Sequence, residues 1–206
     1  MMKVNFLKRL ESSVHAFAIT MDRTVEKIEA LERRLKAFKE HQAKQTETLE
    51  PDLFAVVDED DEDLNEAFQI GSKLKFSMEH LQVDTWLKDL AADKQQLSML
   101  AETAKTVTLD RDAKLIELRS IIEQKIRHPT KNSYGETNKK VIVFCAFADT
   151  ASYLYEALEH WARDELGVHT ALVSGGARPN RTTFGKADYA QILVNFSPRA
   201  KQRNKM

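Results

Sequence analysis

The sequence predicts an α/β protein with a large all-α part, in which a long helical hairpin precedes a partial parallel βαβα unit. Apolar residues recur at steps of three and four over residues 4–45 and again over 78–127, the spacing of a buried helix face. Residues 140–147 form an apolar run without polar alternation, which suits a strand buried on both faces of a sheet. A helix and a second strand follow closely, as in a right-handed crossover unit.

The first helical segment is expected over residues 4–45, which contain no Pro or Gly. Charged side chains fill the faces away from its apolar stripe. A helix of this length must pair with another long helix or form a coiled coil, and the second helical segment favours pairing. The stripe is formed by Leu7, Leu10, Val14, Phe17, Met21, Val25, Ile28, Leu31, Leu35 and Phe38.

An acidic linker near residues 47–77 is expected to connect the two helical segments. Pro51 ends the first helix, and residues 58–63 are all Asp or Glu, a composition typical of a solvated segment. The second segment restarts at Asp110 or Asp112 and ends at His128-Pro129. Residues 1–128 therefore predict a long antiparallel helical region with the acidic linker at its tip.

A polar linker at 129–139 leads to the α/β part, which is expected over residues 140–206. The first strand precedes a helix that Asp149 or Thr150 can cap and that Gly167 ends. Residues 169–173 predict the second strand, and residues 187–201 another short helix. Two parallel strands do not make a viable sheet, so we expect the chain to be a fragment whose sheet is completed elsewhere.

Composition narrows the class of protein. A single cysteine excludes an intrachain disulfide. The sequence shows neither a membrane-spanning run nor a signal-peptide core. We therefore expect a cytoplasmic protein that does not bind a membrane. The net charge of −1 gives no global field for nucleic acid. The end of the chain is nevertheless basic, since Asp188 is opposed by Arg178, Arg181, Lys186, Arg199, Lys201, Arg203 and Lys205.

Patterns for catalysis or metal binding are weak. Cys145 lies in an apolar run and predicts a packed small hydrophobe rather than a nucleophile. The six histidines show no i, i+4 pair, which disfavours a metal site. Leu53–Glu59 looks like the apolar strand and Asp-Glu pair that hold magnesium in P-loop ATPases, but no phosphate-binding glycine loop accompanies it, so we interpret it as linker. The turn after the first strand lacks Gly-x-Gly-x-x-Gly, which disfavours a Rossmann-like enzyme.

Four segments carry a family resemblance: Leu7–Phe17 (LKRLESSVHAF), Lys140–Ala151 (KVIVFCAFADTA), Ala171–Gly176 (ALVSGG) and Ile192–Lys201 (ILVNFSPRAK). They resemble segments of bacterial Swi/Snf-like superfamily-two helicases. The first is similar to the opening of the second half of these proteins, and the second to their motif IV. The third resembles the next strand with its loop, and the fourth the following helix with its Ser-Pro-Arg turn. In that family, the counterparts of the last three segments lie in the second RecA-like domain. The middle of the chain is similar to a family insertion only in character.

The resemblance implies a piece of an ATP-dependent DNA helicase or translocase, contributing part of the second motor lobe. In that family DNA crosses both RecA-like domains, so its implied partners are DNA and the missing first RecA-like domain. Hydroxyls, backbone amides and arginines hold phosphates without reading sequence. The implied DNA-backbone contacts are Thr150, Ser174, Gly175, Gly176, Arg178 and Arg181.

ATP and magnesium are expected for the complete parent enzyme and not for this chain. The sequence contains neither the phosphate-binding loop nor the later motifs with the arginine finger, which stabilises transition-state charge on the γ-phosphate. We therefore expect the chain to be inactive alone. The alternative hypothesis is a helical protein-interaction module with a small α/β adaptor and no catalysis. The oligomeric state, and whether the parent unwinds DNA or remodels protein–DNA complexes, remain open.

Overall fold

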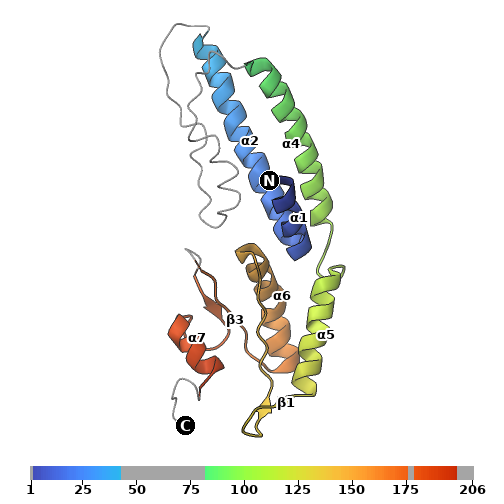
Figure 1. Cartoon of the computed structure of the whole chain (residues 1–206), viewed down its shortest axis with the longest axis vertical. Helices are drawn as coiled ribbons and strands as arrows, with labels where there is room; N and C mark the ends of the chain where they lie inside the picture. Colours follow the sequence, from blue (N-terminus) through green and yellow to red (C-terminus); the bar gives the residue numbers. More distant parts are fainter. Residues whose placement is uncertain (1, 43–81, 176–178, 199–206) are drawn as a thin grey trace. The chain divides into compact units, whose positions relative to one another are not determined.

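The structure is a computed structural model that describes residues 2–42, 82–175 and 179–198 (Figure 1). The chain divides into two compact units, residues 1–106 and 107–206. The described residues are mostly helical, with short strands in two antiparallel pairs. The acidic linker predicted near residues 47–77 lies almost wholly outside the described residues.

Unit 1 is built on two long helices, α2 (Val14–Gln42) and α4 (Val83–Lys105), which pack side by side (Figure 1). Ion pairs join them, and the residue numbers run in opposite directions: Lys39 with Asp84 at 2.6 Å, Lys94 with Glu32 at 2.7 Å, and Lys105 with Asp22 at 3.0 Å. The helices are therefore antiparallel, as the sequence predicts. The pairs set the register between the two helices.

The single helix expected over residues 4–45 is wrong in one respect, because it is divided at Ser13 into α1 (Met2–Ser12) and α2. The Ser13 hydroxyl accepts hydrogen bonds from the backbone of His15 at 3.1 Å and Ala16 at 3.3 Å. A serine whose hydroxyl accepts from the following amides caps the start of a new helix. Ser13 therefore starts α2, although neither Pro nor Gly interrupts the sequence there. The helix α1 then packs against α2.

The core of unit 1 forms where α1, α2 and α4 meet. Met21 and Ala101 are fully buried within a cluster of small and apolar side chains. Thr20 and Thr24 lie buried on the same helix because their hydroxyls donate to the carbonyl four residues earlier, at 2.9 and 2.7 Å. The cluster comprises Phe17, Ala18, Met21, Ala101 and Ala104, with Phe6, Val14 and Leu97 packed against it.

Unit 2 begins with α5 (Ala113–Arg127), which packs on α6 (Ala148–Leu166). Asp112 caps α5 through a 3.0 Å bond from the Leu115 amide, one of the two caps predicted. The buried Tyr153 hydroxyl donates to the other Asp112 oxygen at 2.7 Å, so one carboxylate both starts α5 and ties it to α6. Burial and this bond raise the pKa of Tyr153. The core cluster here is Leu115, Tyr153, Ala157 and Leu158.

The predicted end of α6 is confirmed, and its predicted cap is wrong. Gly167 ends the helix in the left-handed conformation (φ 62°), where glycine carries no Cβ penalty, as predicted. The cap at the start is Phe147 with no side-chain bond, so the expected cap at Asp149 or Thr150 is wrong. Both residues instead lie buried in the first turn of the helix.

The parallel pairing expected between residues 140–147 and 169–173 is not formed. The second strand, β3 (Ala171–Leu172), pairs antiparallel with β4 (Arg181–Thr182). Val141–Cys145 has no strand assignment, and no backbone hydrogen bond is made by Val141–Ala146 within the described part of the chain. A partner only a few residues away closes a smaller loop than one across a helix, which favours the antiparallel pair.

Residues 129–139 contain a small hairpin where a polar linker was expected. The strands β1 (Thr130–Lys131) and β2 (Thr137–Asn138) pair antiparallel. Asn132 Oδ1 accepts from the backbone of Tyr134 and Glu136, both at 2.9 Å, and Gly135 takes a positive φ of 75°. An Asn that bonds the backbone two residues on, followed by Gly, is a turn signal that could have been found in the sequence.

The last described helix, α7 (Tyr189–Phe196), lies within the predicted range 187–201. Asp188 caps it by accepting from the Gln191 amide at 3.1 Å. The Ser197-Pro198 pair follows its end directly, as expected.

Candidate functional site

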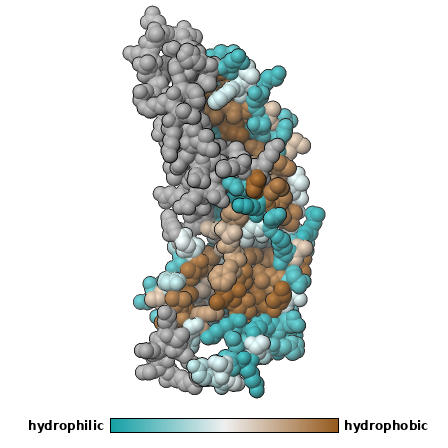
Figure 2. Space-filling view, viewed as in Figure 1, coloured by the Kyte–Doolittle hydropathy of each residue, from teal (hydrophilic) through white to brown (hydrophobic). Residues whose placement is uncertain are grey.

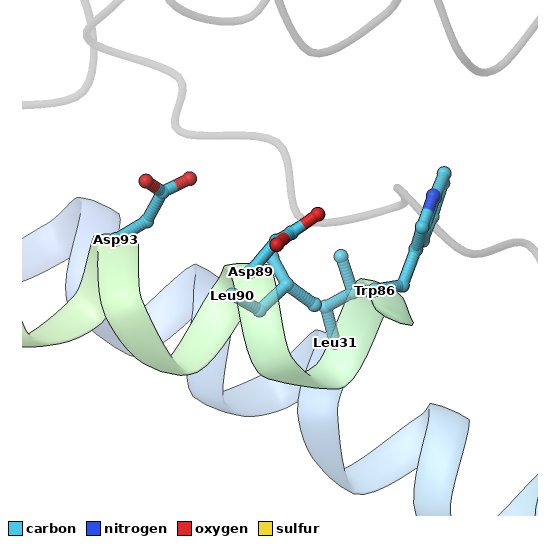
Figure 3. Close-up of a pocket in the computed structure, with 5 residues that line it drawn as sticks. All are labelled: Leu31, Trp86, Asp89, Leu90 and Asp93. Atoms are coloured by element: carbon cyan, nitrogen blue, oxygen red, sulfur yellow. The ribbon is translucent and has the colours of Figure 1, made fainter. Parts of the chain in front are cut away.

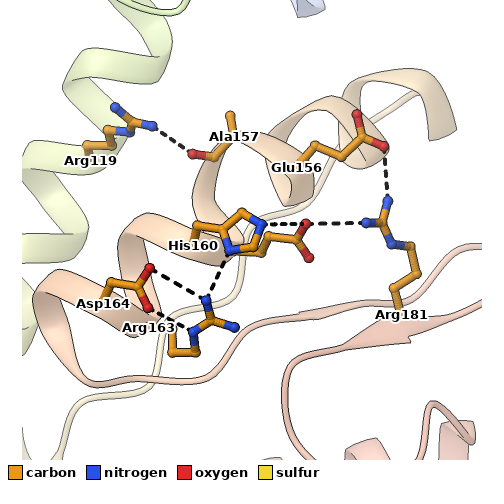
Figure 4. Close-up of polar contacts among 8 residues, drawn as sticks. Arg119, Glu156, Ala157, His160, Arg163, Asp164 and Arg181 are labelled. Atoms are coloured by element: carbon orange, nitrogen blue, oxygen red, sulfur yellow. Dashed lines mark hydrogen bonds and ion pairs between the residues drawn. The ribbon is translucent and has the colours of Figure 1, made fainter.

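Arg181 on β4 is held by α6 (Figure 4). Its guanidinium lies 2.9 Å from Glu156 and 3.4 Å from Glu159, and 4.5 Å from the centroid of the Tyr155 ring. The side chain remains 40% exposed, so water and ions reach it. This predicted phosphate contact therefore already has two carboxylate partners, and an anion would have to compete with them.

Glu159 is the centre of a small charged network on α6. Besides Arg181, it lies 3.7 Å from His160 Nε2 (Figure 4). Burial, with Glu159 as hydrogen-bond partner, raises the pKa of the Tyr155 hydroxyl. Further along the helix, Arg163 contacts Asp164 at 2.8 Å and lowers the pKa of that carboxyl. The outer face of α6 thus balances each cation with a nearby carboxylate.

The other predicted DNA-contact residues differ in position and in exposure. Thr150 is 5% exposed, inside the first turn of α6. Ser174 is half-buried just after β3, and its Oγ is buried without a hydrogen-bond partner among the described residues, while Gly175 beside it is exposed. Gly176 and Arg178 lie outside the described residues. Ser174, Gly175 and Arg181 are therefore the described members near the β3–β4 connection, and Thr150 is not presented at the surface.

A second arginine fastens the inner face of α6. Arg119 on α5 donates to the Ala157 carbonyl at 2.6 Å and lies 5.4 Å from the Trp161 ring (Figure 4). Sequence reasoning did not single out Arg119. Its contacts stabilise the α5–α6 packing and thereby support the helix that carries Glu156 and Glu159.

An open apolar segment precedes α6. Phe144 is 91% exposed, Ile142 59% and Val143 44%. Figure 2 shows apolar side chains gathered on the visible face of unit 2. Exposed apolar residues in a row, on backbone without hydrogen-bond partners, mark a surface that another strand could cover.

Unit 1 offers a shallow hollow of about 250 Å³ between α2 and α4 (Figure 3). Trp86, Asp89 and Asp93 point to the same side of α4, and Leu31 of α2 contributes to its floor. Trp86 is 38% exposed. An indole beside two carboxylates can contact a cationic side chain of a protein partner.

Within the described ranges, no group of three His, Cys, Asp or Glu side chains could hold a metal ion. No described helix combines the length and apolarity needed to cross a bilayer. Cys145 is half-buried, and burial raises the pKa of its thiol, which disfavours the thiolate.

No protein-family model, curated protein or solved structure matches this chain.

Proposed function

We propose that this chain contributes part of the second motor lobe of an ATP-dependent DNA translocase of the Swi/Snf-like superfamily-two type. In this proposal it contacts the DNA backbone near the β3–β4 connection and does not hydrolyse ATP alone. The observation that carries the proposal is the open apolar segment Val141–Ala146, which runs directly into α6 and is followed by β3.

The segment has the properties of an inner strand without its neighbours. It is apolar on successive residues and free of backbone hydrogen bonds within the described part of the chain. A strand buried on both faces of a parallel sheet has this composition, whereas a surface strand alternates with polar residues. The segment is thus suited to a sheet whose other strands lie outside the described residues.

The exposure of Ile142, Val143 and Phe144 is the opposite of the burial that the apolar run predicts. The proposal therefore requires covering strands from another part of a longer protein. Without them, the segment would be an aggregation-prone edge, which proteins normally cover.

The DNA contact is supported by the groups at the end of β3. Gly175 is exposed and Arg181 provides a cation that is 40% exposed, whereas the Ser174 hydroxyl is buried and has no hydrogen-bond partner among the described residues. Such groups bind phosphate without sequence specificity. ATP and magnesium are assigned to the other parts of the parent, since the sequence lacks a phosphate-binding loop.

The test is a comparison of two changes at Arg181 and its carboxylate partners. Arg181→Ala is expected to weaken binding of a short DNA duplex and to reduce the slope of log affinity against log salt by about one. The double change Glu156→Gln with Glu159→Gln is expected to tighten binding, because it releases the same guanidinium. Fluorescence anisotropy at several salt concentrations measures both.

The two variants separate a phosphate contact from a structural one. Both remove the same ion pairs, so a purely structural role of Arg181 would make them change DNA affinity in the same direction. Opposite directions support the proposal. Absence of salt-dependent DNA binding by the wild-type chain and by both variants would reject the contact at this site.

The alternative, a helical protein-interaction module, is favoured by the surface of α4. Met99 is 64% exposed and Leu100 49%, in addition to the hollow beside Trp86. Apolar residues kept at a helix surface are typical of a binding face. Loss of a co-purifying protein partner on Trp86→Ala, with DNA binding absent, would favour this second function.

A further inference from the structure

The β1–β2 hairpin brings together two basic stretches that are separate in the sequence. Arg127 and His128 come just before β1, and Lys139 and Lys140 come just after β2. Because Thr130 faces Asn138 across the antiparallel pair, these flanking residues meet at the open end of the hairpin. The pairing thus turns two short runs into one basic surface.

Two more lysines join this surface. Lys125 Nζ lies 2.5 Å from the Thr130 hydroxyl, which places its ammonium group on β1. Lys131 is exposed on β1 opposite Thr137, and Lys139 follows two residues after Thr137. Such diagonal neighbours lie about 7–8 Å apart across an antiparallel pair. We define the hairpin basic surface as the cations on both faces of this ribbon: Lys131 and Lys139 on one face, Lys125 beside Thr130 on the other, and Arg127 and Lys140 next to them in the chain.

The hairpin basic surface is poorly neutralised within the described residues. Of its members, Arg127 has a carboxylate partner, Glu123, and Lys140 lies 5.4 Å from the Phe196 ring. Lys131 and Lys139 are exposed and have no ion pair or hydrogen bond of the side chain to any described residue. This contrasts with Arg181, whose charge is balanced by two carboxylates.

The dipole of α5 accounts for some of these cations but not for Lys131 and Lys139. Lys125 and Arg127 occupy the last turn of α5, where cations interact favourably with the helix dipole. Lys131 and Lys139 lie on the ribbon, away from any helix end. Tyr134 at the hairpin turn is 72% exposed, so an aromatic side chain accompanies the cations.

We propose that the hairpin basic surface binds the phosphate backbone of duplex DNA, as a contact separate from the β3–β4 connection. The choice of DNA rests on the proposed function, whereas the surface itself follows from the hairpin pairing. Lysines without protein partners release counterions when they meet phosphates, so they contribute affinity that falls with salt. Tyr134 adds a ring that can contact sugar or base.

The experiment compares Lys131→Gln/Lys139→Gln with the control Lys36→Gln/Lys88→Gln. The control removes the same charge from exposed lysines of α2 and α4 that likewise make no ion pair or hydrogen bond to a described residue. The hairpin variant is expected to reduce the salt slope of duplex binding by about two, and the control to leave it unchanged. Equal effects in the two variants would overturn the inference.

Further arms distinguish the sources of binding. Poly-glutamate and vesicles with anionic lipid are tested at the same salt, and binding to either as tight as to DNA would overturn the assignment to nucleic acid. If Arg181→Ala alters the slope while the hairpin variant does not, this inference fails and the proposed function stands. If the hairpin variant alone alters the slope, the hairpin contact stands and the β3–β4 contact fails.

Discussion

Leu115→Ala is expected to destabilise unit 2 by about 2–5 kcal/mol, enough to unfold a marginal unit. Leu115 is fully buried between α5 and α6, within the cluster that contains Tyr153, Ala157 and Leu158. Removing the side chain loses its transfer free energy and leaves a cavity. Urea unfolding followed by Trp161, with Trp86 replaced by Phe, measures the change in unit 2.

The neighbouring residue provides the control. Ile116 is 48% exposed, so Ile116→Ala is expected to cost under about 1 kcal/mol, as surface substitutions do. Comparable losses in the two variants would contradict the α5–α6 packing. The difference between them therefore tests the orientation of α5 as well as the burial of one side chain.

Met21→Ala is expected to lower the stability of the helical hairpin of unit 1 by about 2–5 kcal/mol. Met21 is fully buried in the cluster formed by α2 and α4, next to Ala101. Unfolding followed by Trp86, with Trp161 replaced by Phe, reports on this unit.

Met99→Ala is the matched control because Met99 is 64% exposed on α4. It is expected to change stability by about 0.5 kcal/mol or less. A large loss for Met99 with a small loss for Met21 would mean that α4 presents its other face to α2.

The sequence predicted the helices best, because apolar periodicity and residues that end a helix indicate the same elements. The apolar spacing predicts the antiparallel helices of unit 1, and Asp112 and Gly167 mark real helix ends. Ser13 was missed because its effect depends on hydrogen bonds to two following amides rather than on a helix-breaking residue.

Strand pairing was less predictable because a strand is defined by its neighbours. The composition of Val141–Phe147 favours burial, yet Ile142, Val143 and Phe144 are exposed in the described structure. Arg181 was predicted to contact DNA phosphates, but its carboxylate partners could not be predicted because they come from α6, an earlier helix. The turn of the β1–β2 hairpin is marked by Asn132 and Gly135, but its strands, only two residues long, carry no strand pattern in the sequence.

The central claim is that Val141–Ala146 is a strand of a larger sheet. Amide hydrogen exchange tests it directly, in the 206-residue chain at low concentration and in the full product of the gene that encodes it. The claim predicts fast exchange of these amides in the chain alone and protection as strong as that of α6 in the full product. Fast exchange in the full product would contradict it.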